Sequence, residues 1–323
     1  MTARFRATAD TIPGVSPTPS GRPLRVGVQL PEVERVVRWP EYVAMARAAE
    51  DAGFDSLWLG DHLLYRYDDG SERGPWEVWT MLAAIAASTS RIKLGPLVAA
   101  TAFHAPQMLA KLAATVDEVS GGRLILGLGA GWNEAEFAAF GFPFDHRVSR
   151  FEEAFTIIRT LLREGRIDFD GRFFQARDCA LLPEPARPGG PPLMVGSSGP
   201  RMLEITLPYV EQWNTWYRQP NNSPAGLEPM LRDVDEICRR VGRDPATLEK
   251  TSAVLVAMSG GSGRVTKYDD GDVAPVEGTS AAIAARLREY AELGLAEVQL
   301  VVDPITVESI QALAPVLADL DKG

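Results

Sequence analysis

Residues 124–132 read Leu-Ile-Leu-Gly-Leu-Gly-Ala-Gly-Trp, and the interpretation of the rest of the chain starts from this stretch. Its first three residues form an apolar run that is typical of a buried strand. Glycines at positions 127, 129 and 131 follow, and glycine allows another group to approach the backbone closely. The segment from Asn133 onward favours a helix. We therefore expect a buried strand that opens through a glycine-rich turn.

Two other apolar runs end in glycine and polar residues. One is followed by Gly60-Asp61-His62 and the other by Gly196-Ser197-Ser198-Gly199-Pro200. Apolar runs and helical patterns alternate along the chain, which favours βα units and a parallel sheet. Several strand ends of this kind predict one pocket built by many loops, as in a (β/α)₈ barrel.

The pattern predicts an α/β fold, a TIM (β/α)₈ barrel. The eight expected strands cover residues 24–30, 56–60, 92–99, 124–128, 193–196, 211–216, 250–258 and 297–302. The expected helices cover residues 39–52, 76–90, 105–119, 134–140, 147–163, 200–207, 226–241, 280–293 and 306–320. Insertions are expected after strands two, four and seven, at residues 63–75, 167–192 and 259–278. The second insertion contains a predicted hairpin.

Length and composition favour one large domain. The chain has 323 residues, of which 46% are hydrophobic, and this fraction supplies a sizeable core. We expect residues 24–323 to form a single barrel domain. A flexible arm rich in Thr, Pro, Ser and Gly is expected over residues 1–23. The net charge of −10 argues against nucleic-acid binding.

The chain carries no sequence signal for secretion or for a membrane span. Cys179 and Cys238 are far apart and form neither a disulfide framework nor a metal-binding spacing. No apolar run approaches the ~20 residues that a membrane span needs. The N-terminus lacks the apolar core of a signal peptide. We expect a reduced, cytoplasmic protein that does not bind membranes.

The glycine-rich turn has two interpretations. Its Gly-x-Gly-x-Gly spacing differs from the Gly-x-Gly-x-x-Gly of dinucleotide-binding Rossmann folds. The glycines either allow tight packing between strands or let backbone line a flat ring, with Trp132 as an aromatic wall. The second interpretation makes Gly129, Ala130, Gly131 and Trp132 candidate cofactor-binding residues.

The segment 196–200 precedes a predicted helix and carries two serines. A simple helix cap needs only one serine, and proline suits the first turn of a helix. Backbone amides and hydroxyls at a helix start attract phosphate. We favour a phosphate site formed by Gly196, Ser197, Ser198, Gly199 and Pro200.

Asp61 and His62 follow the second strand directly, on the expected reactive face of the barrel. His62 is the candidate catalytic residue, because imidazole exchanges protons near neutral pH. Asp61 either contacts the cofactor or orients neighbouring backbone. His104 and His146 are interpreted as surface hydrogen-bonding residues. The three histidines lack metal-binding spacing, so we expect no catalytic metal.

Other side chains leave alternatives open. Trp213 and Trp216, at the end of strand six, fit either the core or a pocket wall. Arg147 and Arg150 open a long helix and belong either to a solvated charged face or near a phosphate. The aromatic residues Tyr65, Tyr67, Trp76 and Trp79 are candidate substrate contacts, although Trp76 and Trp79 also suit ordinary helix packing.

Several segments together resemble the luciferase-like monooxygenase superfamily, which includes flavin-dependent monooxygenases and coenzyme F420-dependent oxidoreductases. They are 59–62, 110–123, 127–137 and 140–154. The Gly-Ala-Gly-Trp-Asn-Glu form, at 129–134, is more similar to the F420 branch. The resemblance implies a TIM barrel, a homodimer and a flavin-like ring at the C-terminal mouth of the barrel.

Within that branch, a non-proline cis peptide on the third strand supports the ring. The matching bond is Leu97–Val98, so the resemblance implies that Leu97, Val98 and Ala99 contact the cofactor. Asp61 and His62 match positions near the ring, and 196–200 matches the phosphate-binding loop. Trp132 replaces the glutamate proton donor of the sugar-phosphate dehydrogenases, which argues against a sugar-phosphate substrate. The relatives' Arg-His-Pro before helix three is replaced by Phe103-His104-Ala105-Pro106.

The leading hypothesis is an oxidoreductase that transfers hydride between coenzyme F420 and an unidentified small organic substrate. The first alternative is an FMN-dependent monooxygenase that uses O₂ and receives reduced flavin from a partner reductase. The second alternative is a non-catalytic protein that binds a flavin or deazaflavin, which the missing glutamate at position 132 also fits.

Overall fold

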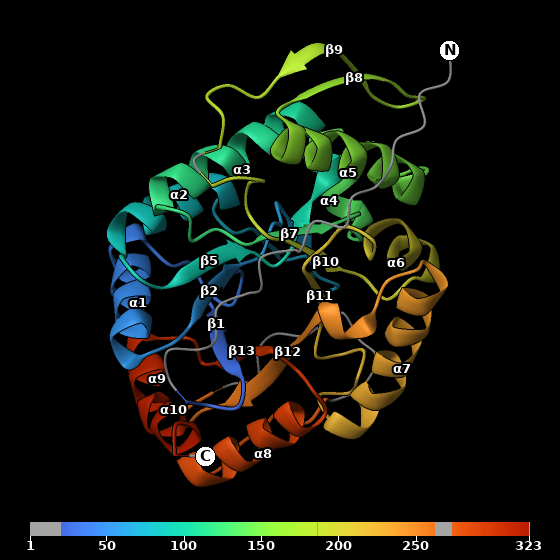
Figure 1. Cartoon of the computed structure of the whole chain (residues 1–323). Coiled ribbons are helices and arrows are strands. Elements are labelled where there is room, and N and C mark those ends of the chain that lie inside the picture. The colour runs from blue at the N-terminus through green and yellow to red at the C-terminus, as the bar shows by residue number, and fades with distance from the viewer. Residues whose placement is uncertain (1–20, 186, 262–272, 323) are drawn as a thin grey trace.

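A computed structural model describes residues 21–185, 187–261 and 273–322. Most of the predicted N-terminal arm and residues 262–272 of the third predicted insertion lie outside these ranges. Parallel strands form a central ring, and helices surround it (Figure 1). The fold is the predicted α/β TIM barrel.

One sheet contains the strands of the ring, in the order β5-β2-β1-β13-β12-β11-β10-β7-β6. Their bounds are β1 Arg25–Gln29, β2 Ser56–Leu59, β5 Lys93–Pro96, β6 Ala99–Ala100, β7 Leu126–Gly129, β10 Leu193–Gly196, β11 Gln212–Thr215, β12 Glu249–Ala257 and β13 Glu297–Asp303. The ring closes beside β5, where Leu94 donates its N–H to the Arg123 carbonyl at 3.2 Å and accepts from Ile125 at 2.9 Å.

The predicted third strand is divided into two. β5 and β6 are separated by Leu97 and Val98, whose peptide bond is cis, as the resemblance implied. β5 pairs with β2, whereas β6 pairs with β7. The two short strands together occupy one of the eight positions of the barrel wall.

The helices match the predicted ones closely. They are α1 Trp39–Ala52, α2 Val78–Ser88, α3 Pro106–Ser120, α4 Glu134–Phe140, α5 Arg147–Glu164, α6 Pro200–Thr206, α7 Pro224–Arg240, α8 Ser280–Glu292, α9 Val307–Ala312 and α10 Ala314–Leu320. Short 3₁₀ turns lie at Thr101–Phe103 and Pro245–Thr247. The single helix expected over 306–320 is two helices, because Pro315 has no N–H for the hydrogen bond that would continue α9.

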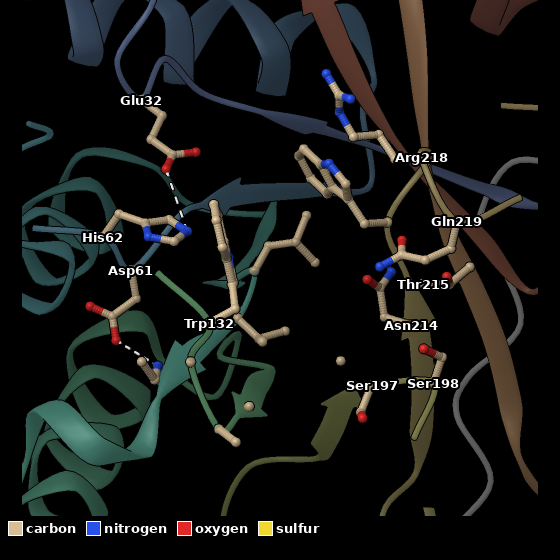
Figure 2. Close-up of a pocket in the computed structure, with 18 of the residues that line it drawn as sticks. Glu32, Asp61, His62, Trp132, Ser197, Ser198, Asn214, Thr215, Arg218 and Gln219 are labelled. Atoms are coloured by element: carbon tan, nitrogen blue, oxygen red, sulfur yellow. Dashed lines mark hydrogen bonds and ion pairs between the residues drawn. The ribbon is translucent and has the colours of Figure 1, made fainter. Parts of the chain in front are cut away.

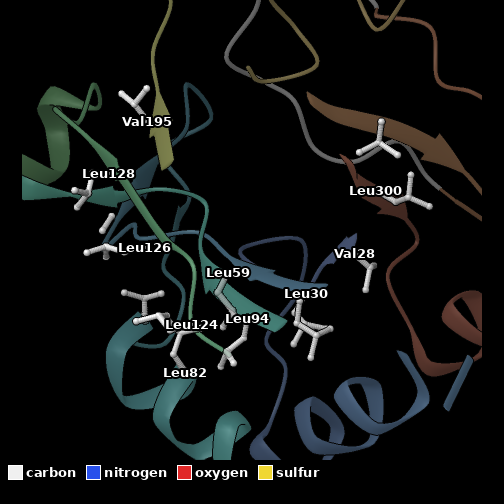
Figure 3. Close-up of a cluster of buried hydrophobic side chains, with 14 of the residues drawn as sticks. Val28, Leu30, Leu59, Leu82, Leu94, Leu124, Leu126, Leu128, Val195 and Leu300 are labelled. Atoms are coloured by element: carbon white, nitrogen blue, oxygen red, sulfur yellow. The ribbon is translucent and has the colours of Figure 1, made fainter. Parts of the chain in front are cut away.

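The main core lies between the ring and the helices. In α1, Tyr42, Met45, Ala46 and Ala49 are buried at helical spacing, and Gly53 ends the helix in the left-handed conformation with φ 92°. Figure 3 shows the aliphatic side chains that the strands and α2 contribute to this core. This packing holds the strand ends, and therefore the loops that follow them, in fixed positions.

The N-terminal end of the barrel interior is filled by a floor cluster, which we define as Arg25, Ser56, Glu249 and Glu297. The Ser56 hydroxyl donates to Glu297 at 2.5 Å, and the Arg25 guanidinium contacts both Glu297 and Glu249. Ser56 and Glu297 have no exposed surface. A buried carboxylate needs such partners, because desolvation of an unpaired charge is costly.

Two of the predicted insertions contain small antiparallel sheets. The segment 63–75, the first expected insertion, holds β3 Tyr65–Arg66 and β4 Glu72–Arg73. Arg73 donates to the carbonyls of Val33 and Glu34, both at 3.2 Å, and so attaches this hairpin to the loop after β1. The hairpin predicted within 167–192 is confirmed as β8 Arg166–Asp170 and β9 Gln175–Ala180, outside the helical ring (Figure 1). No helix in the described part of the chain is long and apolar enough to cross a membrane.

Candidate active site

A cavity of about 690 Å³ opens at the C-terminal ends of the barrel strands. Its size is typical of sites for cofactors and small ligands. The residues that line it are Gln29, Glu32, Val33, Glu34, Asp61, His62, Tyr65, Tyr67, Leu97, Val98, Ala100, Gly129, Ala130, Gly131, Trp132, Glu136, Arg147, Val148, Gly196, Ser197, Ser198, Gly199, Met202, Asn214, Thr215, Trp216, Tyr217, Arg218 and Gln219.

The cavity brings together all but two of the predicted site residues. Ala99 is fully buried behind the wall, because its position in β6 points its side chain into the core. Pro200 begins α6 and lies outside the lining. The structure therefore does not place these two residues on the cavity surface.

The cis bond and the glycines form one packed wall. The Val98 side chain occupies the space beside two strand-end glycines: a Cβ at Gly129 would lie 2.8 Å from Val98, and one at Gly196 would lie 2.9 Å from it. A Cβ at Gly127 would also lie 2.9 Å from Val98, but the nearest obstacle there is the Pro96 carbonyl oxygen, at 2.3 Å. The packing interpretation is confirmed for Gly127 and Gly129, and Gly129 and Gly196 also line the cavity.

Asp61 lies at the end of β2, with its side chain almost entirely buried. It accepts the backbone N–H of Ala100 at 2.9 Å, so its interpretation as a residue that orients neighbouring backbone is confirmed. Burial raises the pKa of Asp61 to about 7, although the hydrogen bond from Ala100 and the charge of His62 oppose this shift. The Nε2 of His104 lies 4.0 Å from the same carboxylate.

His62 lies between two carboxylates on the cavity wall. Its Nδ1 is 2.9 Å from Glu136 Oε1. Its Nε2 is 3.9 Å from Glu32 Oε1 (Figure 2). The Trp132 ring meets the imidazole edge-on, with 5.5 Å between centroids. Burial lowers the pKa of His62, but attraction to Glu32 and the bond to Glu136 outweigh it, so the pKa is raised overall.

The sequence analysis missed both of these carboxylates. Glu136 lies in α4 with no exposed surface, and its Oε2 accepts the N–H groups of Leu63 at 2.8 Å and Leu64 at 3.4 Å. Glu32 accepts the Tyr65 hydroxyl at 2.6 Å. The usable signal for Glu136 was its place in the first turn of a helix that begins at a predicted pocket rim.

The opposite wall is polar. Figure 2 shows Ser197, Ser198, Asn214 and Thr215 facing His62 and Trp132 across the cavity. Asn214 lies near the C-terminal end of β11. Its amide donates to the Thr251 hydroxyl at 2.9 Å and to the Gln299 side-chain oxygen at 2.8 Å, and these bonds fix its orientation.

The two tryptophans of β11 and the following turn have separate roles. Trp213 belongs to the core, and its indole N–H donates to the Ser197 carbonyl at 2.7 Å, which supports the serine loop. Trp216 lines the cavity. The sequence had left the core and the pocket wall open for both residues.

Other candidates take varied positions. Arg147 lines the cavity and donates to the Gly131 carbonyl at 2.7 Å, whereas Arg150 binds Asp145 outside it. Tyr65 and Tyr67 line the cavity. Trp79 belongs to the core, and Trp76, which does not line the cavity, is 48% exposed. In the described ranges, no group of three or more His, Cys, Asp or Glu side chains is arranged to hold a metal ion.

The surface interpretation of His104 is wrong. Its side chain is only 19% exposed, it meets the Trp79 ring edge-on at 6.4 Å between centroids, and burial lowers its pKa. The residue follows the short 3₁₀ turn that ends at Phe103. His146 is half-exposed, at the start of α5.

A family model described as luciferase-like monooxygenase matches residues 20–264. The F420-dependent hydroxymycolic acid dehydrogenase of Mycobacterium tuberculosis is 32% identical over 247 residues, which is 75% of this chain and 66% of that protein. Pyrimidine monooxygenase RutA of Methylorubrum extorquens is 33% identical over 173 residues, 52% of this chain and 46% of that protein. The chain thus spans about half to two thirds of the length of these curated relatives.

The fold is also shared with a solved structure, an F420-dependent secondary alcohol dehydrogenase in complex with an F420-acetone adduct. The TM-score is 0.77, and the match covers 92% of this chain and 99% of the other, with 17% sequence identity. At this identity the likeness establishes the arrangement of strands and helices alone.

Proposed function

Because this chain belongs to the luciferase-like monooxygenase family, we propose that it is an oxidoreductase that transfers hydride between coenzyme F420 and a small organic substrate. The observation that carries the proposal is the arrangement around one cavity of the Leu97–Val98 bond, the His62 imidazole and the serine loop. The similarity to an F420-dependent dehydrogenase over 75% of the chain supports it.

The residues around the cavity fit a flat ring with a phosphorylated tail. Leu97, Val98 and the backbone from Gly129 to Trp132 supply the surface for the ring. Ser197, Ser198 and Gly199 offer hydroxyl and amide groups for the tail. Ala99 and Pro200 act from outside the lining, by supporting β6 and by starting α6.

When bound, F420 supplies the hydride chemistry, as cofactors do for reactions that side chains cannot perform. His62 exchanges the accompanying proton with the substrate at its Nε2, the ring nitrogen that is not bonded to Glu136. The raised pKa keeps the imidazole protonated to a higher pH than usual, so it can act as an acid near neutrality. Trp132 and Trp216 limit the access of water to this region.

Binding of the two coenzymes tests the proposal directly. Purified protein is titrated with F420 and, separately, with FMN, and ligand fluorescence is followed. We expect saturable binding of F420 and much weaker binding of FMN. Tight binding of FMN together with no binding of F420 would overturn the proposal.

The second candidate is an FMN-dependent monooxygenase supplied with reduced flavin by a partner reductase. The similarity to a pyrimidine monooxygenase favours it. It predicts consumption of O₂ when reduced FMN and substrate are present, whereas the F420 reaction needs no oxygen. The third candidate, a non-catalytic cofactor-binding protein, predicts binding of a coenzyme with no change of its absorbance when substrates are screened.

We also propose that the protein forms a homodimer. Met108 and Val119, both in α3, are 56% and 45% exposed, and a second copy of the chain could cover such side chains. Light scattering coupled to size-exclusion chromatography measures the mass in solution, and a value near the 35.1 kDa of one chain would contradict the dimer.

A further inference from the structure

Both nitrogens of the His62 ring have a carboxylate neighbour, but the two contacts differ. The Nδ1 contact with Glu136 is a hydrogen bond at 2.9 Å, made by a residue with no exposed surface. The Nε2 atom is 3.9 Å from Glu32, beyond hydrogen-bond distance. Nε2 is therefore the nitrogen with access to a ligand.

We propose that Glu136 is a positioning residue that keeps a proton on His62 Nδ1 and so reserves Nε2 for proton exchange with the substrate. The inference rests on the proposed function in one respect, the assignment of proton exchange to His62. Glu136, in α4, thus controls which nitrogen of His62, which follows β2, carries the proton.

The hydrogen bonds of Glu136 explain why the proton lies on Nδ1. Oε2 accepts the N–H groups of Leu63 and Leu64. These backbone donors fix the direction of the carboxylate and leave Oε1 facing the ring. A carboxylate oxygen accepts hydrogen bonds, so Nδ1 must donate, and neutral His62 then has its lone pair on Nε2.

The loop that carries His62 is held by α4 through a second contact. The Asn133 amide donates to the Leu64 carbonyl at 2.8 Å, next to the amides that Glu136 binds. The groups that face His62 are Glu32 from the loop after β1, Asp61 beside it, the Tyr65 ring from β3, and Glu136 from α4. A purely structural role for Glu136 would require only that it hold this loop.

Glu136→Gln separates positioning from loop support. A glutamine has one acceptor oxygen, which we expect to stay with the two backbone donors. Its NH₂ group then faces Nδ1 and requires that nitrogen to accept. The loop is retained, whereas neutral His62 changes to the form protonated on Nε2, and its imidazolium form loses a hydrogen-bonded anion.

Nitrogen NMR of ¹⁵N-histidine-labelled protein without cofactor measures both properties. The chain has only three histidines, and His62→Gln assigns the signals of interest. In wild type at high pH we expect His62 protonated on Nδ1. In Glu136→Gln we expect it protonated on Nε2, with its titration midpoint moved to lower pH.

Glu153→Gln is the matched control. Glu153 also accepts backbone amides, from Arg172, Phe173 and Phe174, but it holds the β8–β9 hairpin instead of the cavity wall. It should leave the His62 signals unchanged. The proposal is overturned if wild-type His62 is protonated on Nε2, or if Glu136→Gln keeps both the wild-type tautomer and midpoint. Because the measurement uses no coenzyme, failure to bind F420 would leave this result intact.

Discussion

The Asp61 carboxylate accepts the backbone N–H of Ala100 at 2.9 Å, and this bond joins the end of β2 to the two-residue strand β6. It spans the Leu97–Val98 bulge, where the third strand of the barrel is divided. Asp61 therefore fixes a wall of the cavity with a buried side chain whose pKa lies far above its usual value.

The first prediction concerns the pH dependence of stability. The pKa of Asp61 is raised from 3.8 to about 7, so the folded state favours the protonated form. That contribution is complete below pH 4 and is lost as the pH rises toward 7. Asp61→Asn retains an acceptor for Ala100 and has no charge to bury. We expect the variant to gain stability relative to wild type between pH 4 and pH 8, by on the order of 2–4 kcal/mol.

Urea unfolding of both proteins at several pH values measures this difference. Equal pH dependence in wild type and variant would show that Asp61 does not titrate in this range.

The second prediction concerns His62. His62→Asn removes the titratable ring from the cavity wall, so turnover with F420 should fall by about 10²–10⁴-fold while F420 affinity stays near wild type. Because the pKa of His62 is raised, wild-type turnover in the direction in which His62 donates the proton should decline as the pH rises through that pKa. Stopped-flow kinetics across pH measure both effects. His146→Asn, at the half-exposed start of α5, is the control. Wild-type turnover by the His62 variant would remove this residue from the mechanism.

The third prediction concerns the packed wall. Gly129→Ala places a methyl group against the Val98 side chain, so we expect a loss of about 1–3 kcal/mol in the free energy of unfolding. Val98→Ala in the same protein should recover part of that loss. It should rescue Gly127→Ala much less, because there the Pro96 carbonyl oxygen, which belongs to the backbone, would still lie 2.3 Å from the new Cβ once the Val98 contact at 2.9 Å is relieved. A double-mutant cycle of unfolding free energies checks this; equal rescue of both variants would contradict the packing described here.

The fourth prediction concerns the proposed tail site. Ser198→Asp adds a negative charge to the serine loop, and this charge repels the phosphate of the tail. We expect F420 binding to weaken at least about tenfold, which corresponds to about 1.4 kcal/mol of binding free energy. Ala246→Asp adds the same charge on the exposed turn before β12, at the other end of the barrel, and should leave binding unchanged. If both variants bind F420 like wild type, the tail lies elsewhere.

Local signals gave much of the fold. Pro40 near the start of α1 and Gly53 at its end are strong helix boundaries, and the predicted bounds of α1 match the structure. The cis bond in the third strand came only from the family resemblance, because a cis bond before Val98 leaves no trace in hydropathy. The two-residue strands β3 and β4 are too short for their alternation to be recognised.

The site was predicted where strand ends carry glycine or polar residues, and missed where it depends on contacts distant in sequence. His62 and Glu136 are 74 positions apart. No periodicity relates them, because their approach depends on how β2 and β7 are placed around the ring. Glu32 was missed for the same reason, since its partners follow a different strand.

The floor cluster determines which end of the barrel a ligand can use to reach the cavity. With Ser56 and Glu297 wholly enclosed at the base, the described chain offers a ligand no exit by that route. In the described residues, a ligand therefore enters and leaves the cavity at the C-terminal ends of the strands.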